Sequence, residues 1–448
     1  MYEFKKTDSK ELERTITITL AMVIILTHLV NFLQQLKVLD LGRIEGGSIV
    51  LPLGALILLF FDIMYFIKSE EKKFKPVYIF VILTIISLIL SFVFAKDKDF
   101  AISGADLHAE GIFVFLSYLV IFVSATLITD DKNRKNLYFL MTALGVFEVV
   151  LGVLQAQVQP EFLKATLEEA YFDTQRAYGT LENPNPYGSV MAVYLAMETV
   201  LCIGFEKKNR LIHALLVGVY AYGLFLSGTR GAIVGYVFAM LMLATLFAIR
   251  IFAKKEKPTK KTAFGILVTV IAVLAAFVIF YVSAKSSFED ISSRVAADVN
   301  TQNAEQLGTS RIQLWKETIK IYKESNLFLG IGISNLVEYV NLGDYWLLNY
   351  DAHNRYLQIL VTMGLVGLTV YISFILYVFW IGIKRVIKVE AKGRLGIICL
   401  LACYITYMVA DFFCIGVYSL APYIYIVMGL IVSHVVYETT NVEIKEQS

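Results

Sequence analysis

Twelve long apolar segments divide the chain, and each is bounded by charged residues, glycine or proline. They cover residues 15–34, 48–67, 76–95, 111–129, 137–158, 187–205, 211–228, 232–251, 263–283, 355–380, 395–413 and 418–437. A helix of about 20 apolar residues crosses the hydrocarbon core of a bilayer and makes all its backbone hydrogen bonds internally. The pattern therefore predicts about twelve transmembrane helices.

Composition agrees with this pattern. Hydrophobic residues make up 57% of the 448 positions and charged residues 17%, whereas soluble domains have about 45–50% and about 25%. The excess of apolar side chains must face lipid, so we expect an all-α integral membrane protein embedded in the lipid bilayer. The net charge of +2 gives no indication of nucleic-acid binding, and we expect none.

The distribution of lysine and arginine orients the spans. Of the 40 basic residues, 26 fall at the amino terminus and in every second connection, and 14 fall on the other side. Seven of those 14 lie in one 71-residue connection, and long loops escape the positive-inside rule. We therefore expect both termini in the cytoplasm. The expected division is spans 1–9 in residues 1–283, an external loop in 284–354, and spans 10–12 with a cytoplasmic tail in 355–448.

The external loop is predicted to contain an amphipathic helix that runs from Arg311 to Glu324. Ser310 and Gln313 form a capping-box pattern at its start. With about 100° of rotation per residue, Arg311 falls on the same arc as Trp315 and the other apolar side chains. Three lysines fall on the water-facing arc: Lys316, Lys320 and Lys323.

Several polar residues are predicted to share the outer face. Arg176 follows the fifth span, Arg230 lies between the seventh and eighth, and Arg311 begins the loop helix. The planar guanidinium of arginine matches phosphate oxygens in two places at once and stays charged in a low-dielectric site. Each arginine alone is more often an ordinary lipid-headgroup contact. Their shared side, with His353 and Asn354 at the outer end of the tenth span, predicts an anionic ligand such as a polyprenyl diphosphate.

Four motifs lie between residues 176 and 367. They are Arg176-x-x-Gly-Thr-x-x-Asn183-Pro-Asn185; Ser-Gly-Thr-Arg230-Gly; Arg311 with Trp315 ahead of Phe-Leu-Gly-Ile-Gly; and His353-Asn354 followed after nine residues by Gly364-Leu-Val-Gly367. Together they resemble the O-antigen ligase and O-antigen polymerase family. The sequence departs from that family at Asn326, near a position where the family usually has proline.

The resemblance implies a metal-independent, inverting membrane glycosyltransferase that needs no cofactor. Its donor would be a glycan on undecaprenyl diphosphate, and its acceptor a hydroxyl of a glycan or lipid-linked molecule, at the outer face of a bacterial cytoplasmic (inner) membrane. His353 would act on the acceptor hydroxyl. The diphosphate would be held by Arg176, Arg230 and Arg311. Supporting residues would be Asn354, Asn183, Asn185 and Trp315.

A secondary transporter or flippase of lipid-linked sugars is the alternative. Transporters built from two six-span halves join them after the sixth span, but here that connection covers only Glu206 to Arg210, and the two halves do not resemble each other. The transferase is therefore favoured. Within the transferase class, ligase and polymerase both remain open, and the single dominant external loop leans toward a ligase.

Four acidic residues lie within predicted spans: Asp62, Glu148, Glu198 and Asp411. A charge at that depth costs about 2.5 to 3.5 kcal/mol, so we expect these side chains to pair with polar groups or to hold a proton. We place only Asp411, nearest the outer end, close to the site. The pattern assigns no role to His28 and His213.

Overall fold

The computed structural model describes residues 2–39, 46–69, 75–104, 110–159, 176–205, 207–254, 259–300, 307–339, 351–388 and 394–447. Within these ranges the chain folds into helices, and no strand occurs in them. The prediction of an all-α protein is confirmed.

The helices have the following bounds in chain order: α1 (Tyr2–Gln35), α2 (Gly46–Lys68), α3 (Val77–Phe94), α4 (Lys98–Ser103), α5 (Ile112–Thr126), α6 (Asp131–Val153), α9 (Pro184–Gly204), α10 (Lys207–Ser227), α11 (Arg230–Lys254), α12 (Lys260–Ser283), α13 (Lys285–Asn300), α14 (Leu307–Glu324), α15 (Arg355–Lys388), α16 (Arg394–Ala410) and α17 (Ala421–Gln447). Three short elements join them: η1 (Leu154–Val158), η3 (Leu336–Glu338) and η6 (Asp411–Phe413).

The predicted spans correspond to helices of the structure. In the described part of the chain, ten helices are long and apolar enough to cross a membrane. The other two predicted spans are shorter apolar helices, at Ile112–Thr126 and Ala421–His434. The chain is therefore a multi-pass membrane protein.

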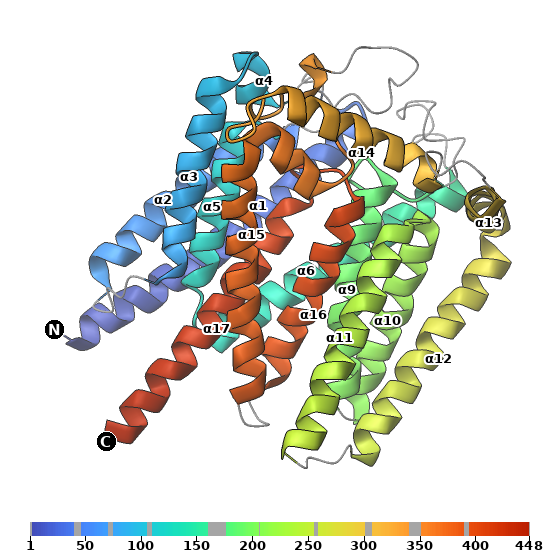
Figure 1. The fold of residues 1–448 in the computed structure, drawn as a ribbon. Coiled ribbons are helices and arrows are strands. Elements are labelled where there is room, and N and C mark those ends of the chain that lie inside the picture. Colours follow the sequence, from blue (N-terminus) through green and yellow to red (C-terminus); the bar gives the residue numbers. More distant parts are fainter. Residues whose placement is uncertain are drawn as a thin grey trace.

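The bundle has two outer groups of helices with a third group between them (Figure 1). α1, α2, α3 and α5 form one group, and α9, α10, α11 and α12 form the other. α15, α16 and α17 join the groups, because α15 packs against α3, α17 against α5, and α16 against α9 and α11. α9 is buried along nearly its whole length.

Large apolar side chains cover the perimeter of the bundle. They are numerous on α2 and α12 and include Leu53, Leu56, Ile57, Ile266, Leu267 and Leu274, each more than half exposed except Ile266 at 49%. A water-soluble protein rarely exposes so large a continuous apolar surface. We infer that these faces contact lipid.

The two ends of the bundle differ. α1 begins and α17 ends at one end, whereas α13 and α14 lie at the opposite end (Figure 1). There α14 packs against α15 and α13 lies between α12 and α14. The segment 284–354 therefore has at least two helices rather than the single predicted one.

α13 was missed because its inward side is not a simple apolar stripe. Phe288 and Ile291 face the protein, but so do Asp290, Arg294 and Asp298, which are half-buried. A charged inward face weakens the apolar period by which helices are recognised in a sequence.

The predicted start of the loop helix is also wrong. α14 begins at Leu307, so Ser310 lies inside the helix and is not its cap. Its buried face is rotated from the predicted arc, since Leu314 is 3% and Thr318 2% exposed while Ile319 is 36% exposed. The main prediction holds, because Arg311 lies toward the protein body and the three lysines are exposed.

α15 is broken at Gly364, where φ is 66° and ψ is −169°. A side chain there would be strained, and its Cβ would lie 2.3 Å from the carbonyl of Phe328. The break frees backbone groups that would otherwise bond within the helix, and such groups must find other partners inside a membrane protein.

The Phe-Leu-Gly-Ile-Gly motif supplies these partners. Four hydrogen bonds of 2.9–3.2 Å join it to α15, from the N–H groups of Ile331 and Gly332 to the carbonyls of Val361 and Thr362, and from those of Leu365 and Val366 to the carbonyls of Leu327 and Phe328. The two glycine motifs of the sequence are therefore the two sides of one joint. Asn326 makes the adjoining turn without proline, because its Oδ1 accepts from the N–H groups of Phe328 and Leu329.

Candidate functional site

Two of the sequence motifs meet at Arg176. Its Nε donates to the carbonyl of Ser227 at 2.6 Å, and its Nη2 donates to Oγ1 of Thr229 at 3.4 Å. The hydroxyl of Thr229 donates in turn to the carbonyl of Pro184 at 2.7 Å. The segment before α9 and the turn before α11 therefore form a single unit.

The two predicted supporting asparagines of this segment begin α9. Asn183 is the N-cap, and its Oδ1 accepts from the N–H of Asn185 at 2.9 Å. The carbonyl of Asn185 accepts from the hydroxyl of Ser189 at 3.0 Å. Pro184 occupies the first helical position, where its missing N–H costs nothing. The contacts seen for both asparagines are thus local ones that start the helix.

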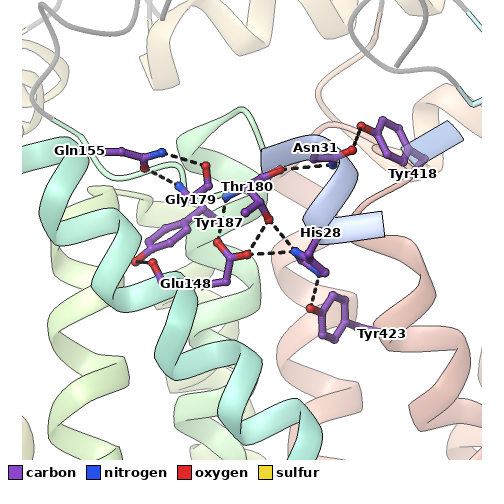
Figure 2. Close-up of polar contacts among 9 residues, drawn as sticks. All are labelled: His28, Asn31, Glu148, Gln155, Gly179, Thr180, Tyr187, Tyr418 and Tyr423. Carbon is purple, nitrogen blue, oxygen red and sulfur yellow. Dashed lines mark hydrogen bonds and ion pairs between the residues drawn. The ribbon is translucent and has the colours of Figure 1, made fainter. Parts of the chain in front are cut away.

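A buried polar network anchors the backbone just after Arg176 (Figure 2). Glu148 accepts from the N–H and the hydroxyl of Thr180 at 2.9 and 2.5 Å, and His28 Nδ1 lies 2.9 Å from its carboxylate. Gln155 accepts from the N–H of Gly179 at 2.7 Å and donates to its carbonyl at 2.9 Å. α1 and α6 therefore hold the segment that carries Arg176.

Two of the buried carboxylates thus pair with histidines that had no assigned role. Glu148 meets His28, and Glu198 lies 2.6 Å from Nδ1 of His213. Asp62 accepts from the hydroxyl of Ser124 at 2.8 Å. The expectation of structural pairing within the spans is confirmed for these three carboxylates.

Arg230, of the Ser-Gly-Thr-Arg-Gly motif, is the first residue of α11. Its guanidinium forms an ion pair with Asp298 of α13, and the two side chains are 32% and 24% exposed. One turn earlier on α13, Arg294 pairs with Asp290 at 2.8 Å. Neither aspartate was a predicted site residue, and both lie in a helix that the sequence pattern did not reveal.

The arginines are close enough to influence one another. Burial, then the neighbouring charge of Arg294, lowers the pKa of Arg176 to about 9, and Arg311 and Arg230 act in the same direction. Burial and Arg230 also lower the pKa of Arg311. The structure therefore brings the three predicted arginines together and adds Arg294. Several positive charges close together in a half-buried site favour the binding of an anion.

Arg311 reaches this group from α14. Trp315, one turn further along, packs edge-on against Phe412 with ring centroids 5.5 Å apart. In the described part of the chain, the buried indole N–H of Trp315 has no hydrogen-bond partner. Such an N–H normally has one, so this donor is available to a ligand.

His353 stands just before α15 in a backbone conformation that side chains rarely adopt, with φ of 51°. Such strain is concentrated at functional sites. The N–H of His353 donates to Oδ1 of Asp351 at 2.6 Å, and its Nδ1 lies 3.2 Å from the carbonyl of Asp351. A carbonyl can only accept, so in this contact Nδ1 carries a proton, which in a neutral ring leaves the lone pair to Nε2.

Asn354, not His353, caps α15. Its Oδ1 accepts from the N–H groups of Tyr356 and Leu357 at 3.0 and 3.1 Å. A purely capping role for His353, which would tolerate asparagine or glutamine there, does not fit this geometry.

The turn from η6 to α17 connects His353 with the arginines. Burial raises the pKa of the Cys414 thiol to about 12, and the charges of Arg311 and Asp351 both act on this thiol. The N–H of Gly416 donates to Oδ2 of Asp351 at 3.2 Å. Gly231, beside Arg230, packs against Phe413. The residues from Asp411 to Gly416 therefore lie between the group of arginines and the His353 loop.

One ion pair beside His353 was not predicted. Arg355, at the start of α15, pairs through both terminal nitrogens with Glu110, to which Tyr118 donates at 2.8 Å. Asp351 and these two charged residues line a cavity of about 20 Å³, room for a water molecule. Glu110 precedes α5 and gave no motif, so only the three-dimensional fold brings it here.

Residues 214–372 match the family model described as O-antigen ligase. This stretch, about a third of the chain, is similar to the O-antigen ligase family, which supports the resemblance carried by the motifs. The matched stretch contains Arg230, Arg311 and His353 of the resemblance, whereas Arg176 lies outside it. No curated protein matches the chain. Among the residues that the structure describes, no three His, Cys, Asp or Glu side chains come together as a metal site.

Together with the apolar helices, the match supports a membrane glycan transferase of the O-antigen ligase/polymerase type. The matched stretch runs from α10 to the first half of α15 and includes both helices of the segment 284–354.

Proposed function

We propose that the protein transfers a glycan from an undecaprenyl-diphosphate carrier to an acceptor hydroxyl, at the outer face of a bacterial cytoplasmic membrane. The proposal rests mainly on one observation: a group of arginines lies on one side of the turn of residues 411–416, and His353, whose Nδ1 faces a backbone carbonyl, lies on the other. The first suits a diphosphate, and the second suits a general base.

Arg176, Arg230 and Arg311 would bind the diphosphate oxygens through paired hydrogen bonds. Their charges would stabilise the negative charge that grows on the diphosphate as its bond to the sugar carbon breaks. Trp315 has an N–H available near the same place. None of these steps requires a metal ion, because arginine supplies the positive charge.

His353 would act at the acceptor. Its Nε2 would take the hydroxyl proton while the hydroxyl oxygen attacks the sugar carbon on the side opposite the departing diphosphate. One carbon–oxygen bond forms as another breaks, so the configuration at that carbon inverts. The Asp351 carbonyl, which accepts from Nδ1–H, would stabilise the charged imidazole that results.

The acceptor hydroxyl can belong to a second lipid-linked glycan, as in a polymerase, or to a different surface lipid, as in a ligase. Both acceptors present the same chemical group to His353. Sided action at the outer face follows from the proposed orientation, which puts α13 and α14 outside and both termini in the cytoplasm.

Purified protein in liposomes with labelled lipid-linked glycan tests the proposal against a transporter. A transferase releases carrier diphosphate and forms a product with a new glycosidic bond. Movement of intact lipid-linked glycan across the bilayer, without bond exchange, would contradict the proposal.

A further inference from the structure

α13 places a charged face directly against the arginine group. Ile291 packs on the turn at Gly228, because a Cβ on that glycine would lie 2.8 Å from Ile291 Cγ1 and 3.4 Å from Arg176 Nε. Arg294 follows Ile291 by nearly one turn, and Asp298 follows Arg294 by another. The helix thus holds an arginine and two aspartates beside the turn that carries Arg230.

Two of the four arginines have no carboxylate partner in the part of the chain that the structure describes. Arg230 and Arg294 pair with Asp298 and Asp290, whereas Arg176 and Arg311 form no ion pair with a described residue. A sugar diphosphate linked to a prenyl chain carries one ionised oxygen on each phosphate, hence two negative charges. Such a ligand offers its negative charges to these two arginines.

The two aspartates also differ in the location of their ion-pair partners. Asp290 pairs with Arg294 within α13, four residues away, whereas Asp298 reaches across to Arg230 on α11. The side chains of the Arg230–Asp298 pair are about a quarter to a third exposed, so a ligand can reach it. A carboxylate and a phosphate offer arginine the same planar pair of oxygens.

We propose that Arg294 is a fourth phosphate-binding residue and that Asp298 is an exchangeable counterion, which holds Arg230 until the diphosphate of the donor replaces it. This inference rests on the proposed function and adds to it an exchange of the ion-pair partner of Arg230. When the sugar leaves, the diphosphate gains a further negative charge, which the guanidinium of Arg230 would stabilise in place of Asp298.

The test measures binding of farnesyl diphosphate to the purified, full-length protein in detergent. Asp298→Asn keeps the shape of the side chain and removes its charge, so the ligand no longer competes for Arg230. Exposed ion pairs are worth roughly 0.2–1 kcal/mol, which corresponds to binding that is tighter by a factor of about 1.4 to 5. Arg294→Gln should weaken binding by roughly tenfold to a hundredfold, the usual effect of losing a charge-assisted hydrogen bond.

Two controls isolate the effect. Glu289→Gln removes a carboxylate from the outward face of the same helix, where it lies 3.7 Å from Lys285, and should leave binding unchanged. In an Arg230→Gln background, Asp298→Asn should have a smaller effect than in the wild type, because only the attraction of Asp298 to other groups such as Arg311 then remains. Asp298→Ser serves as a second neutral variant if the asparagine variant accumulates poorly.

Unchanged or weaker binding by a folded Asp298→Asn variant would overturn the exchange, and normal binding by Arg294→Gln would remove Arg294 from the site. Either result leaves the proposed transfer reaction intact. Conversely, tight and Asp298-sensitive binding without any glycan transfer would contradict the proposed function but support this inference. A wild-type protein that does not bind farnesyl diphosphate would contradict both.

Discussion

At the scale of single residues, the proposed site depends on the planar geometry of the guanidinium groups as well as on their positive charge. Arg230 can offer two parallel N–H donors to a phosphate, and lysine cannot reproduce that geometry. Arg230→Lys should therefore lower transfer roughly tenfold to a hundredfold although the charge is kept. The measurement is the transfer rate at matched protein abundance.

Lys316 is the matched control for the neighbouring arginine of α14. Lys316→Ala, on the exposed face, should cost little, whereas Arg311→Ala should cost about as much as a change at Arg230. If the two alanine variants lost equal amounts of transfer activity, the side of α14 on which a basic residue lies would not matter for function.

Arg176 gives a pH dependence. Because its pKa is lowered to about 9, it is protonated and able to bind an anion below that pH and loses its proton above it. Binding of farnesyl diphosphate should fall as the pH rises from 8 to 10, a range in which the ligand's own charge stays constant. An arginine with its ordinary pKa would give a flat profile, which would contradict this reading of the site.

Much of the residue-scale picture could be predicted from the sequence, because Arg176, Arg230, Arg311 and His353 lie in motifs with fixed spacing. What the motifs could not give is the partners. Asp298, Arg294 and Glu110 come from segments without motif spacing, and only packing brings them to the site. The same holds for His28, whose carboxylate partner is 120 residues away.

At the scale of elements, the break in α15 couples two motifs that are far apart in the sequence. Gly364→Ala should destabilise the protein strongly, because it adds backbone strain of about 1–3 kcal/mol and a Cβ that overlaps the carbonyl of Phe328. Gly218→Ala is the control, since its Cβ would lie no closer than 3.8 Å to any other group. The melting temperatures of both variants are measured by thermal unfolding in detergent. Equal melting temperatures would contradict the stabilising role of the joint between α15 and the Phe-Leu-Gly-Ile-Gly motif.

Element boundaries followed the apolar runs closely where the helices face lipid, as in α2 and α12. They failed for α13 and for the start of α14, where the inward faces carry arginine and aspartate. Charged side chains on an inward face disturb the apolar pattern from which helices are recognised.

At the scale of the whole molecule, the proposed orientation can be tested by labelling. A cysteine placed at Ser292, on the exposed face of α13, should react with an impermeant thiol reagent in cells with a permeable envelope. A cysteine at Thr259, before α12, should not react unless the membrane is opened. The four native cysteines are buried, so the background should be low. The reverse pattern of labelling would overturn the proposed side of the site.

The central claim is that His353 takes the proton of the acceptor hydroxyl, and one measurement tests it most directly. Glycan transfer from a purified lipid-diphosphate donor is compared for wild type, His353→Ala and His353→Gln at matched protein levels, with and without a chelator. General-base catalysis contributes about 10² to 10⁴ in rate, so both variants should lose transfer by such a factor while binding farnesyl diphosphate normally, and the chelator should have no effect. Near-normal transfer by His353→Gln would exclude base catalysis, and loss of wild-type transfer with the chelator would contradict the metal-independent mechanism.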